Sequence, residues 1–328
     1  MLLYLIRRLF GMVPLIIGIT FISFVVVHLA PGDPTQFLSS MNPKISETAR
    51  EKFIKMYNLD KPVYIQYFLW LKKFVKFDFG ESFSQDRKKV IDKILERLPV
   101  TLWLNIASMV LVFAIALPLG VMSAYLRDTI FDKAVTVFVF VGFAIPTFWL
   151  ALLCMYYFGV IVGVLPISGL TSYNFESMTL FEKIIDIIKH AFLPVFLSVF
   201  GSLAGLSRFA RNSMLDVLNE DYIVAARARG IGEGRIIFKH ALKNALLPVV
   251  TIIGLSVPGL IGGSVIFESI FSIPGMGQLF YQSVMMRDYP VIMGILVIGA
   301  ILTLLGNLLA DIMYAVVDPR IRYKKRAG

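Results

Sequence analysis

Long apolar runs dominate this chain and limit what it can fold into. A helix needs about 20 apolar residues to cross a hydrocarbon core about 30 Å thick. Only 16% of the 328 residues are charged and 57% are hydrophobic, whereas soluble domains are roughly 25% charged. Six runs approach or exceed the required length: Leu9–Ala30, Thr101–Tyr125, Ala134–Val162, Ala191–Leu206, Ala245–Phe267 and Pro290–Ala310. We therefore predict an all-α membrane protein with six transmembrane helices.

Three of these runs have features of their own. Leu9–Ala30 follows Arg7 and Arg8, as in a signal peptide, but it exceeds the usual apolar segment of about 7–15 residues and no small-residue cleavage site follows. We interpret it as an uncleaved first span. Pro146 lies inside the third run and predicts a tilt or a kink. Ala191–Leu206, with 16 residues, is the shortest of the six.

The positions of the basic residues bear on orientation. If both termini are cytoplasmic, the inner segments hold 16 Lys and Arg, and the two shorter outer loops hold three. The outer loop Pro31–Val100 holds another 13, which would make the two sides equal. Loops longer than about 60 residues cross largely regardless of charge, so this loop is set aside. We predict cytoplasmic termini.

The same runs suggest a division of the chain into four parts. Residues 1–30 form an N-terminal transmembrane helix, 31–99 a folded extracytoplasmic extension, 100–318 the main transmembrane domain and 319–328 a basic cytoplasmic tail. Within the extension, Asp60 could cap a helix over Val63–Lys76. Apolar residues recur there at helical spacing, namely Tyr64, Phe68, Leu71 and Val75.

The residues that enzymes use are sparse. Of the three histidines, His28 and His190 fall near the outer ends of predicted spans and His240 is cytoplasmic, so the three could not share a metal ion. Cys154 is the single cysteine and lies in an apolar run, which favours a packing role. No metal-binding, nucleophile or phosphate-binding motif is present. We expect no catalytic residue, metal or cofactor on this chain, so energy for active transport would come from another subunit.

Charged residues inside a membrane are costly and are functional candidates for that reason. Glu268 and Asp311 close the fifth and sixth predicted spans. We interpret Asp311 as a solvated helix end. Glu268 is followed by the Pro/Gly-rich segment Ser269–Gly277, which could fold back at an outer pore mouth where an acid would meet a charged solute. A solvated helix end remains the alternative for Glu268.

A charged segment between the fourth and fifth spans has the most distinctive pattern. Asp221–Gly230 is typical of an amphipathic helix that ends at a glycine, because Gly230 can adopt positive φ. A second short helix is predicted over Glu233–Lys243. The apolar face would comprise residues at helical spacing: Leu215, Leu218, Tyr222 and Ala226. We refer to residues 207–244 as the elbow.

The elbow is suited to contact with another surface. Its small residues permit close approach and its arginines can pair with acids or carbonyl groups. The candidate contact residues are Asp221, Tyr222, Ala225, Ala226, Arg227, Ala228, Arg229 and Gly230. The alternative is an interfacial helix whose arginines contact anionic lipid.

These residues resemble the cytoplasmic Glu-Ala-Ala loop of ABC importer permeases, the helix pair that sits in a groove of the ATP-hydrolysing subunit. The wider chain is similar to the first permease subunit of the dipeptide/oligopeptide family. The matching stretches are Ile6–Leu9, Pro31–Pro34, Leu59–Pro62, Gln66–Tyr67, Arg211–Leu215, Asp221–Gly230, His240–Pro248, Ile270–Gly277, Arg287–Pro290 and Asp318–Arg322. Two positions depart from the general loop pattern. Val224 stands where a Glu is expected. The general pattern also has a proline at the end of a four-residue motif that begins ten residues after the glycine, whereas this chain has His240–Lys243 there and its proline at Pro248.

The resemblance implies a type I ABC importer permease fold and an assembly of several chains in a bacterial or archaeal plasma membrane. A second, related permease, two ATP-binding subunits that hold ATP and Mg, and an extracytoplasmic solute-binding protein would be the partners. The elbow would couple ATP hydrolysis to alternating access for di- or oligopeptides. Nickel chelates, glutathione or oligosaccharides are alternative substrates. An autonomous channel or an intramembrane enzyme is the alternative from another class.

Overall fold

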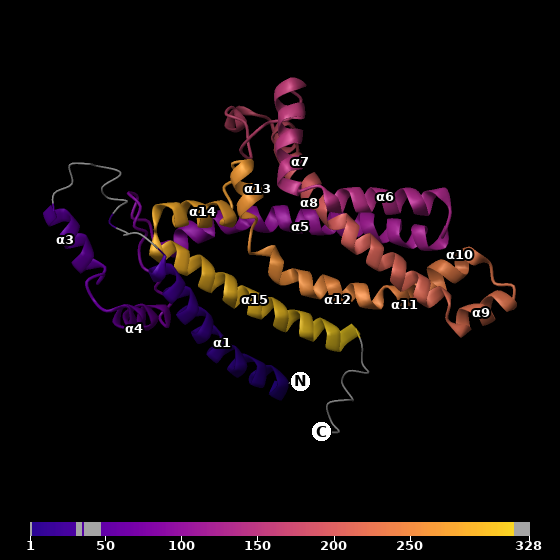
Figure 1. Cartoon of the computed structure of the whole chain (residues 1–328), viewed down its shortest axis with the longest axis horizontal. Helices are drawn as coiled ribbons and strands as arrows, with labels where there is room; N and C mark the ends of the chain where they lie inside the picture. The colour runs from indigo at the N-terminus through magenta and orange to yellow at the C-terminus, as the bar shows by residue number, and fades with distance from the viewer. Residues whose placement is uncertain (1, 31–34, 36–46, 318–328) are drawn as a thin grey trace. The chain divides into compact units, whose positions relative to one another are not determined.

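The structure is a computed structural model that describes residues 2–30, 35 and 47–317 (Figure 1). Its described regular elements are helices. They are α1 (Leu2–Leu29), α3 (Glu47–Met56), α4 (Val63–Phe74), α5 (Val90–Tyr125), α6 (Ile130–Ala144), α7 (Thr147–Cys154), α8 (Leu180–Leu218), α9 (Asp221–Ala228), α10 (Glu233–Arg235), α11 (Leu242–Ala245), α12 (Leu247–Ser256), α13 (Val265–Ile270), α14 (Met276–Met286) and α15 (Tyr289–Val317). The predicted all-α fold is confirmed. The predicted tail, 319–328, lies outside the described residues.

Among the described residues, four helices are long and apolar enough to cross a membrane. They are Ile6–Leu29, Val90–Tyr125, Leu180–Leu218 and Tyr289–Leu309. A fifth candidate consists of Ile130–Ala144 and Thr147–Ile161, which meet at 92°. Pro146 lies at this bend, where it removes a backbone donor and disfavours helical geometry in the residue before it. The kink predicted in the third run is therefore confirmed.

The fifth predicted span, Ala245–Phe267, is wrong as a continuous helix. The structure places there the end of α11, the ten-residue α12, a short 3₁₀ turn over Val257–Leu260 and the start of α13. Proline and glycine account for the breaks, because proline lacks a donor and glycine weakens a helix interior. These residues are Pro248, Pro258, Gly259, Gly262 and Gly263.

The shortest predicted span proved to be part of the longest described helix. α8 has 39 residues. The prediction was shorter because the ends of α8 carry polar residues, which a search for apolar runs rejects. Thr179 and Glu182 form a capping box at its start: Thr179 Oγ1 accepts from the backbone of Glu182, whose carboxylate accepts from the Thr179 backbone. The helix therefore begins well before Ala191.

The described residues belong to two compact units. The first lies within Met1–Thr101, Ile261–Val265 and Pro274–Leu308, and the second within Leu102–Leu260, Ile266–Ile273 and Leu309–Gly328. The core of the first unit is rich in aromatic and β-branched side chains and includes Phe24, Tyr67, Phe83, Ile94 and Val291.

Helix α4 belongs to the first unit and differs from its prediction in two ways. Asp60 does not cap it: the N-cap position is Pro62, with no side-chain hydrogen bond. The predicted apolar face is also largely exposed, since Tyr64 and Phe68 are 65% and 64% exposed, whereas Tyr67 is 6% exposed. The helix buries the face that contacts α1, and the hydrophobic pattern alone did not distinguish that face from its neighbour.

In the second unit, α6 and α7 both pack against α8. The backbones of α5 and α8 come close at Gly120, where a Cβ atom would lie 2.5 Å from the carbonyl oxygen of Ser207. Arg211 of α8 makes a two-pronged ion pair with Asp132 of α6, with Nε–Oδ1 and Nη2–Oδ2 distances of 2.8 and 2.7 Å. Ser123 of α5 also donates to Asp132. One carboxylate therefore connects three helices.

Candidate functional site

The elbow begins with a break after α8. α8 ends at Leu218, and Glu220 is the N-cap of α9. α9 ends at Ala228, after which Gly230 has φ +74° and its amide donates to the Arg227 carbonyl at 2.9 Å. Left-handed geometry at this position favours glycine because it has no Cβ. The predicted stop at Gly230 is confirmed.

The second helical segment of the elbow runs through three pieces. α10 leads into a π-helical turn over Ile236–Ala241, which leads into α11. This matches the short helix predicted over Glu233–Lys243, except that its middle is wound more widely. π-Helical insertions occur frequently at functional sites. α9, α10 and α11 form a helix–turn–helix beside the end of α8 (Figure 1).

A small apolar core fixes the elbow to α5 and α8. Ile223 and Ile236 are fully buried and Ala226 is 6% exposed. They pack with Val121 and Ala124 of α5 and with residues near the end of α8. This contact sets the orientation of α9 against two long helices, so a displacement of α9 would act directly on both.

The predicted apolar face of the elbow is partly wrong. Leu218 and Ala226 are buried, but Tyr222 is 42% exposed and Ile223 takes the buried position. The non-helical Glu220 (φ −70°, ψ 144°) resets the register between α8 and α9. Residues counted along one continuous helix therefore do not share a face across this break.

The opposite side of the elbow faces outward. Of the candidate contact residues, Ala226 is buried and the other seven are exposed, namely Asp221, Tyr222, Ala225, Arg227, Ala228, Arg229 and Gly230. Arg227 Nε lies 2.8 Å from Glu233 Oε1, and the Tyr222 hydroxyl accepts from Asn244 Nδ2 at 2.7 Å. Exposed ion pairs contribute about 0–1 kcal/mol to stability. These contacts therefore mainly orient side chains on a surface of small residues and cations.

Glu268 is buried, whereas the alternative prediction of a solvated helix end requires an exposed side chain. It is 4% exposed within α13, so it is not a solvated helix end. Its backbone carbonyl accepts from Ile273 at 2.8 Å, and Gly169 donates to the Phe271 carbonyl at 2.8 Å. The Pro/Gly-rich segment is therefore a tight turn in which Phe271, Ile273 and Met276 are buried. The assignment of Glu268 to a pore mouth stays a prediction.

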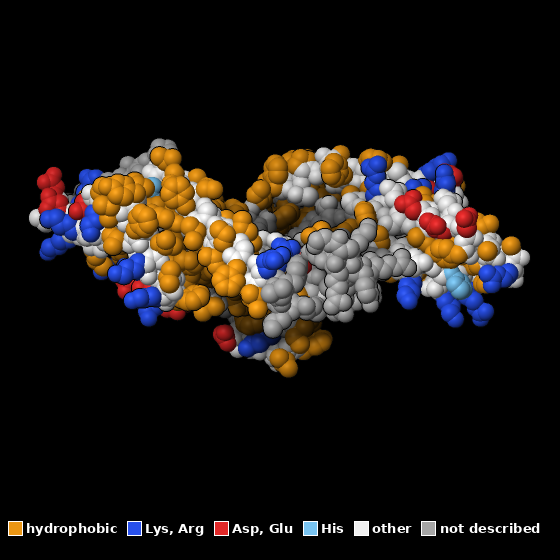
Figure 2. All heavy atoms as spheres, turned by 90° about the horizontal axis from the view of Figure 1, so that it is seen from below, with side chains coloured by type: hydrophobic (Ala, Val, Ile, Leu, Met, Phe, Trp, Pro, Cys, Tyr) orange, Lys and Arg blue, Asp and Glu red, His pale blue; other side chains and the backbone are white. Residues whose placement is uncertain are grey.

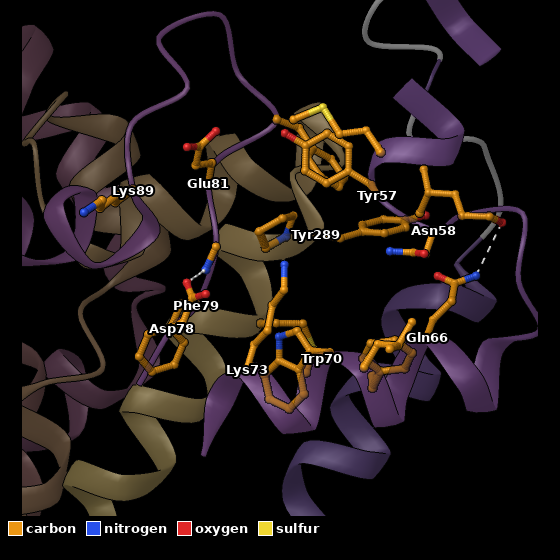
Figure 3. A pocket seen from close by; sticks show the side chains of 18 of the residues that line it. Tyr57, Asn58, Gln66, Trp70, Lys73, Asp78, Phe79, Glu81, Lys89 and Tyr289 are labelled. Atoms are coloured by element: carbon orange, nitrogen blue, oxygen red, sulfur yellow. Dashed lines mark hydrogen bonds between the residues drawn. The ribbon is translucent and has the colours of Figure 1, made fainter. Parts of the chain in front are cut away.

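The structure also contains a cavity that the sequence analysis did not identify. It has a volume of about 630 Å³ in the first unit, within the size range of ligand pockets. Figure 3 shows the Lys73 ammonium pointing into it between Trp70 and Tyr289. The Trp70 indole nitrogen is buried without a hydrogen-bond partner among the described residues. The lining also includes Lys89, Asp78 and Glu81, so charges of both signs surround the aromatic walls.

His28 lines the same cavity and is held by its neighbours. Its Nδ1 lies 2.8 Å from the Phe24 carbonyl oxygen and its Nε2 3.3 Å from Gln66 Oε1. His190 belongs to the second unit, where Nδ1 lies 2.8 Å from the Asp186 carbonyl oxygen. Among the described residues, no group of three or more His, Cys, Asp or Glu side chains could hold a metal ion.

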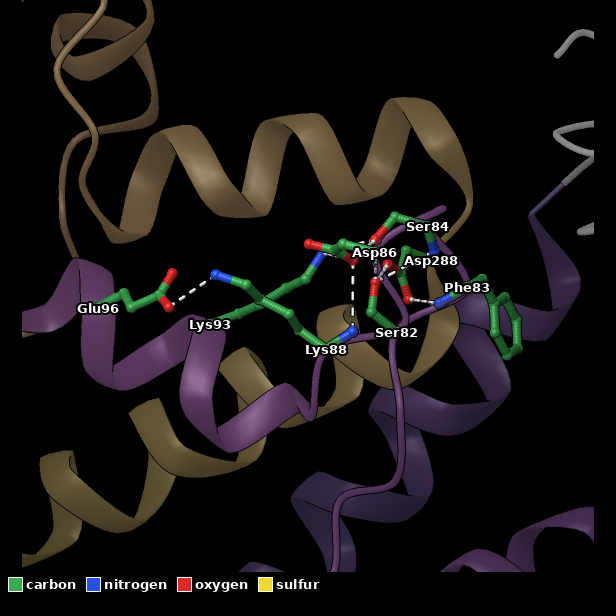
Figure 4. Close-up of polar contacts among 8 residues, drawn as sticks. All are labelled: Ser82, Phe83, Ser84, Asp86, Lys88, Lys93, Glu96 and Asp288. Carbon is green, nitrogen blue, oxygen red and sulfur yellow. Dashed lines mark hydrogen bonds and ion pairs between the residues drawn. The ribbon is translucent and has the colours of Figure 1, made fainter.

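A polar network joins the loop before α5 to the start of α15. The Asp288 carboxylate, 3% exposed, accepts from Ser82 Oγ and from the Phe83 amide (Figure 4). Nearby, Asp86 pairs with Lys93 at 3.0 Å. Burial favours the neutral acid, but hydrogen bonds from Ser84, Lys93 and the Lys88 backbone outweigh it and hold the pKa of Asp86 below its usual value.

Comparisons with known proteins agree along most of the chain. Residues 116–323 match the family model described as binding-protein-dependent transport system inner membrane component, and residues 1–105 match the model of its N-terminal part. The oligopeptide transport system permease protein AppB of Bacillus subtilis is 47% identical, over 98% of this chain and 99% of its own. Two relatives from Escherichia coli are each 36% identical and cover 99% of this chain and 100% of their own: the dipeptide permease DppB and the glutathione permease GsiC.

A solved structure supports the fold. A chain of the MetNI methionine ABC transporter in an inward-facing conformation superimposes with a TM-score of 0.55 at 23% identity. The match covers 72% of this chain and 100% of that one. The shared fold is that of a type I importer permease.

Proposed function

Because this chain belongs to the family of inner membrane components of binding-protein-dependent transport systems, we propose that it is the translocation-pore subunit of an ATP-driven importer of di- and oligopeptides. Membership makes it a multi-pass membrane protein and a transporter subunit. The 47% identity to an oligopeptide permease over nearly the full length of both chains favours peptides. The 36% identity to a glutathione permease keeps glutathione, itself a small peptide, as the second candidate.

The observation that carries the coupling role is the elbow. It has a buried apolar side fixed to α5 and α8 and an exposed side of alanines and arginines. No nucleotide-binding motif occurs in the sequence, so ATP and Mg would be held by two partner ATPase subunits that contact this exposed side. A second related permease and an extracytoplasmic solute-binding protein complete the assembly that we propose.

The elbow can be tested without disturbing its own core. Ala228 is exposed at the end of α9, so Ala228→Trp adds bulk on the contact side while Ile223 and Ala226 stay packed. We expect substrate-stimulated ATP hydrolysis of the assembled transporter to fall about 10-fold or more, equivalent to an increase of at least about 1.4 kcal/mol in the activation free energy. Arg227→Glu combined with Arg229→Glu should have the same effect by reversing the charge.

The matched control is Ser177→Trp, an exposed position near the start of α8 rather than its end. It should leave stimulated ATP hydrolysis unchanged. Gly230→Pro is the backbone variant, since proline cannot adopt φ +74°. The elbow is not the coupling site if the Ala228 and arginine variants reach the membrane and the transporters assembled with them hydrolyse ATP at the unmodified rate.

A further inference from the structure

Helix α4 contacts α1 far from the end of that span. Tyr67 of α4 is buried, and its hydroxyl lies 3.0 Å from Thr20 Oγ1 and 3.3 Å from the carbonyl oxygen of Ile17. Both partners belong to the candidate span Ile6–Leu29. Thr20 precedes Leu29 by nine residues, which corresponds to about 13 Å of helix. Half of a hydrocarbon core is about 15 Å thick, so this contact lies at membrane depth.

The face of α4 beside this contact is apolar and exposed. Tyr64, Phe68 and Val75, which follows the last residue of α4, are 65%, 64% and 71% exposed. Their spacing places them on one side of the helix. Exposed apolar patches of this kind mark surfaces that meet another apolar phase.

This face continues the lipid-facing surface of α1. Phe21 of α1 is 52% exposed, and its ring packs edge-on against Tyr67 with the centroids 5.5 Å apart. The ring centroids of Tyr67 and Phe68 are 5.9 Å apart. Only 17% of the apolar window of α1 is buried. Figure 2 shows hydrophobic side chains gathered over the part of the first unit that α1 and α4 form, with Lys and Arg side chains at its margin.

The ends and length of α4 suit a helix that enters a membrane without crossing it. Its 12 residues are too few to span a core that requires about 20. A helix satisfies its own backbone hydrogen bonds, which a lipid environment requires. Lys72 and Lys73 lie in its last turn, and such long side chains can extend their charges toward the interface.

We propose that α4 is embedded in the membrane beside α1, in the half of the bilayer that adjoins Leu29, with Tyr64, Phe68 and Val75 against lipid acyl chains. The extension predicted over 31–99 then has a lipid-embedded part as well as an aqueous one. α3 would be the aqueous part, because its exposed residues include Glu51 and Lys52. α3 has few apolar residues, so it serves as the water-exposed reference for α4.

The test is the accessibility of a nitroxide label in the full-length chain, reconstituted in vesicles of phosphatidylethanolamine and phosphatidylglycerol. Cys154→Ser removes the single cysteine, and Phe68→Cys then places one label on the proposed lipid face. We expect oxygen, which concentrates in hydrocarbon, to collide with this label several-fold more often than a water-soluble nickel chelate does. Lys52→Cys on α3 is the control and should show the reverse order.

Two results would overturn the proposal. If the nickel chelate reaches the label at 68 as readily as the label at 52, this face of α4 is in water. If neither oxygen nor the chelate reaches it, protein covers the face instead of lipid. Tyr64→Cys, on the same face, repeats the measurement should the Phe68 variant fail to reach the membrane. Because peptide uptake is not the readout, the outcome is independent of the proposed transport function.

Discussion

Glu268 is a buried acid in a chain whose apolar segments contain few charges. With 4% of its surface exposed, its ionised form would lack most of the hydration that stabilises a carboxylate in water. Such an acid within a membrane domain is a functional candidate by default. We propose that it lies along the solute path, at the pore mouth that the following tight turn would form.

A single substitution tests Glu268. Glu268→Gln keeps the shape of the side chain and its capacity for hydrogen bonds but removes the charge, so we expect uptake of cationic peptides to fall several-fold relative to neutral ones. Uptake of radiolabelled peptides that differ only in charge provides the measurement. Glu176→Gln, at an exposed position, is the control. Equal uptake of all peptides by the Glu268 variant would restrict this residue to a structural role.

At the scale of elements, the ion pair of Asp132 and Arg211 holds α6 to α8, and the hydroxyl of Ser123 adds α5. The side chains are 5% and 25% exposed, so each partner depends on the other for much of its solvation. Removal of one member of a buried pair leaves an uncompensated charge and costs more than removal of both. Two of these helices, α5 and α8, also pack against the elbow.

We therefore expect Asp132→Asn to destabilise the protein by about 3 kcal/mol. Arg211→Gln in the same chain should restore part of that loss, because the orphaned guanidinium is gone. Thermal unfolding in detergent of both single variants and the double variant gives the coupling free energy. Strictly additive effects would show that the contact contributes nothing to the connection between α6 and α8.

At the scale of the whole molecule, the chain has the features of one subunit of a larger transporter. Its described residues show four apolar helices and a bent pair that could cross a membrane, and its sequence has no nucleotide-binding motif. We propose that the energy for net transport enters through contacts with other chains, which makes the elbow rather than a reactive centre the proposed site.

Reconstitution tests this division of labour. We expect the purified chain alone to support neither peptide flux nor ATP hydrolysis in vesicles, and uptake to begin when the second permease, the ATPase subunits and the solute-binding protein are added. Flux measured across vesicles with a fluorescent peptide distinguishes the cases. Sustained conductance or flux by the chain alone would instead favour the channel alternative.

The sequence was sufficient for the features that depend on local chemistry. Apolar runs predicted a helical membrane protein, Pro146 predicted a tilt or kink where the structure has a 92° bend, and Gly230 predicted where α9 ends. Each follows from backbone geometry or from transfer into lipid, which act over a few neighbouring residues. The motifs, taken in order along the chain, were specific enough to identify the family.

Tertiary structure decided the features that depend on residues distant in the chain. α4 buries Tyr67 against α1 and exposes the face that was predicted to be buried. The sequence could not choose between these two apolar faces, because the choice depends on which one the neighbouring helix contacts. Ile223 replaces Tyr222 in the core because the break at Glu220 resets the register. The pairing of Asp132 with Arg211 joins residues 79 positions apart. The sequence by itself therefore determined that the chain is a helical membrane protein, but it did not show that Ala245–Phe267 is broken into short helices. Only packing between helices determined which side chains meet, since burial is a property of the assembled fold.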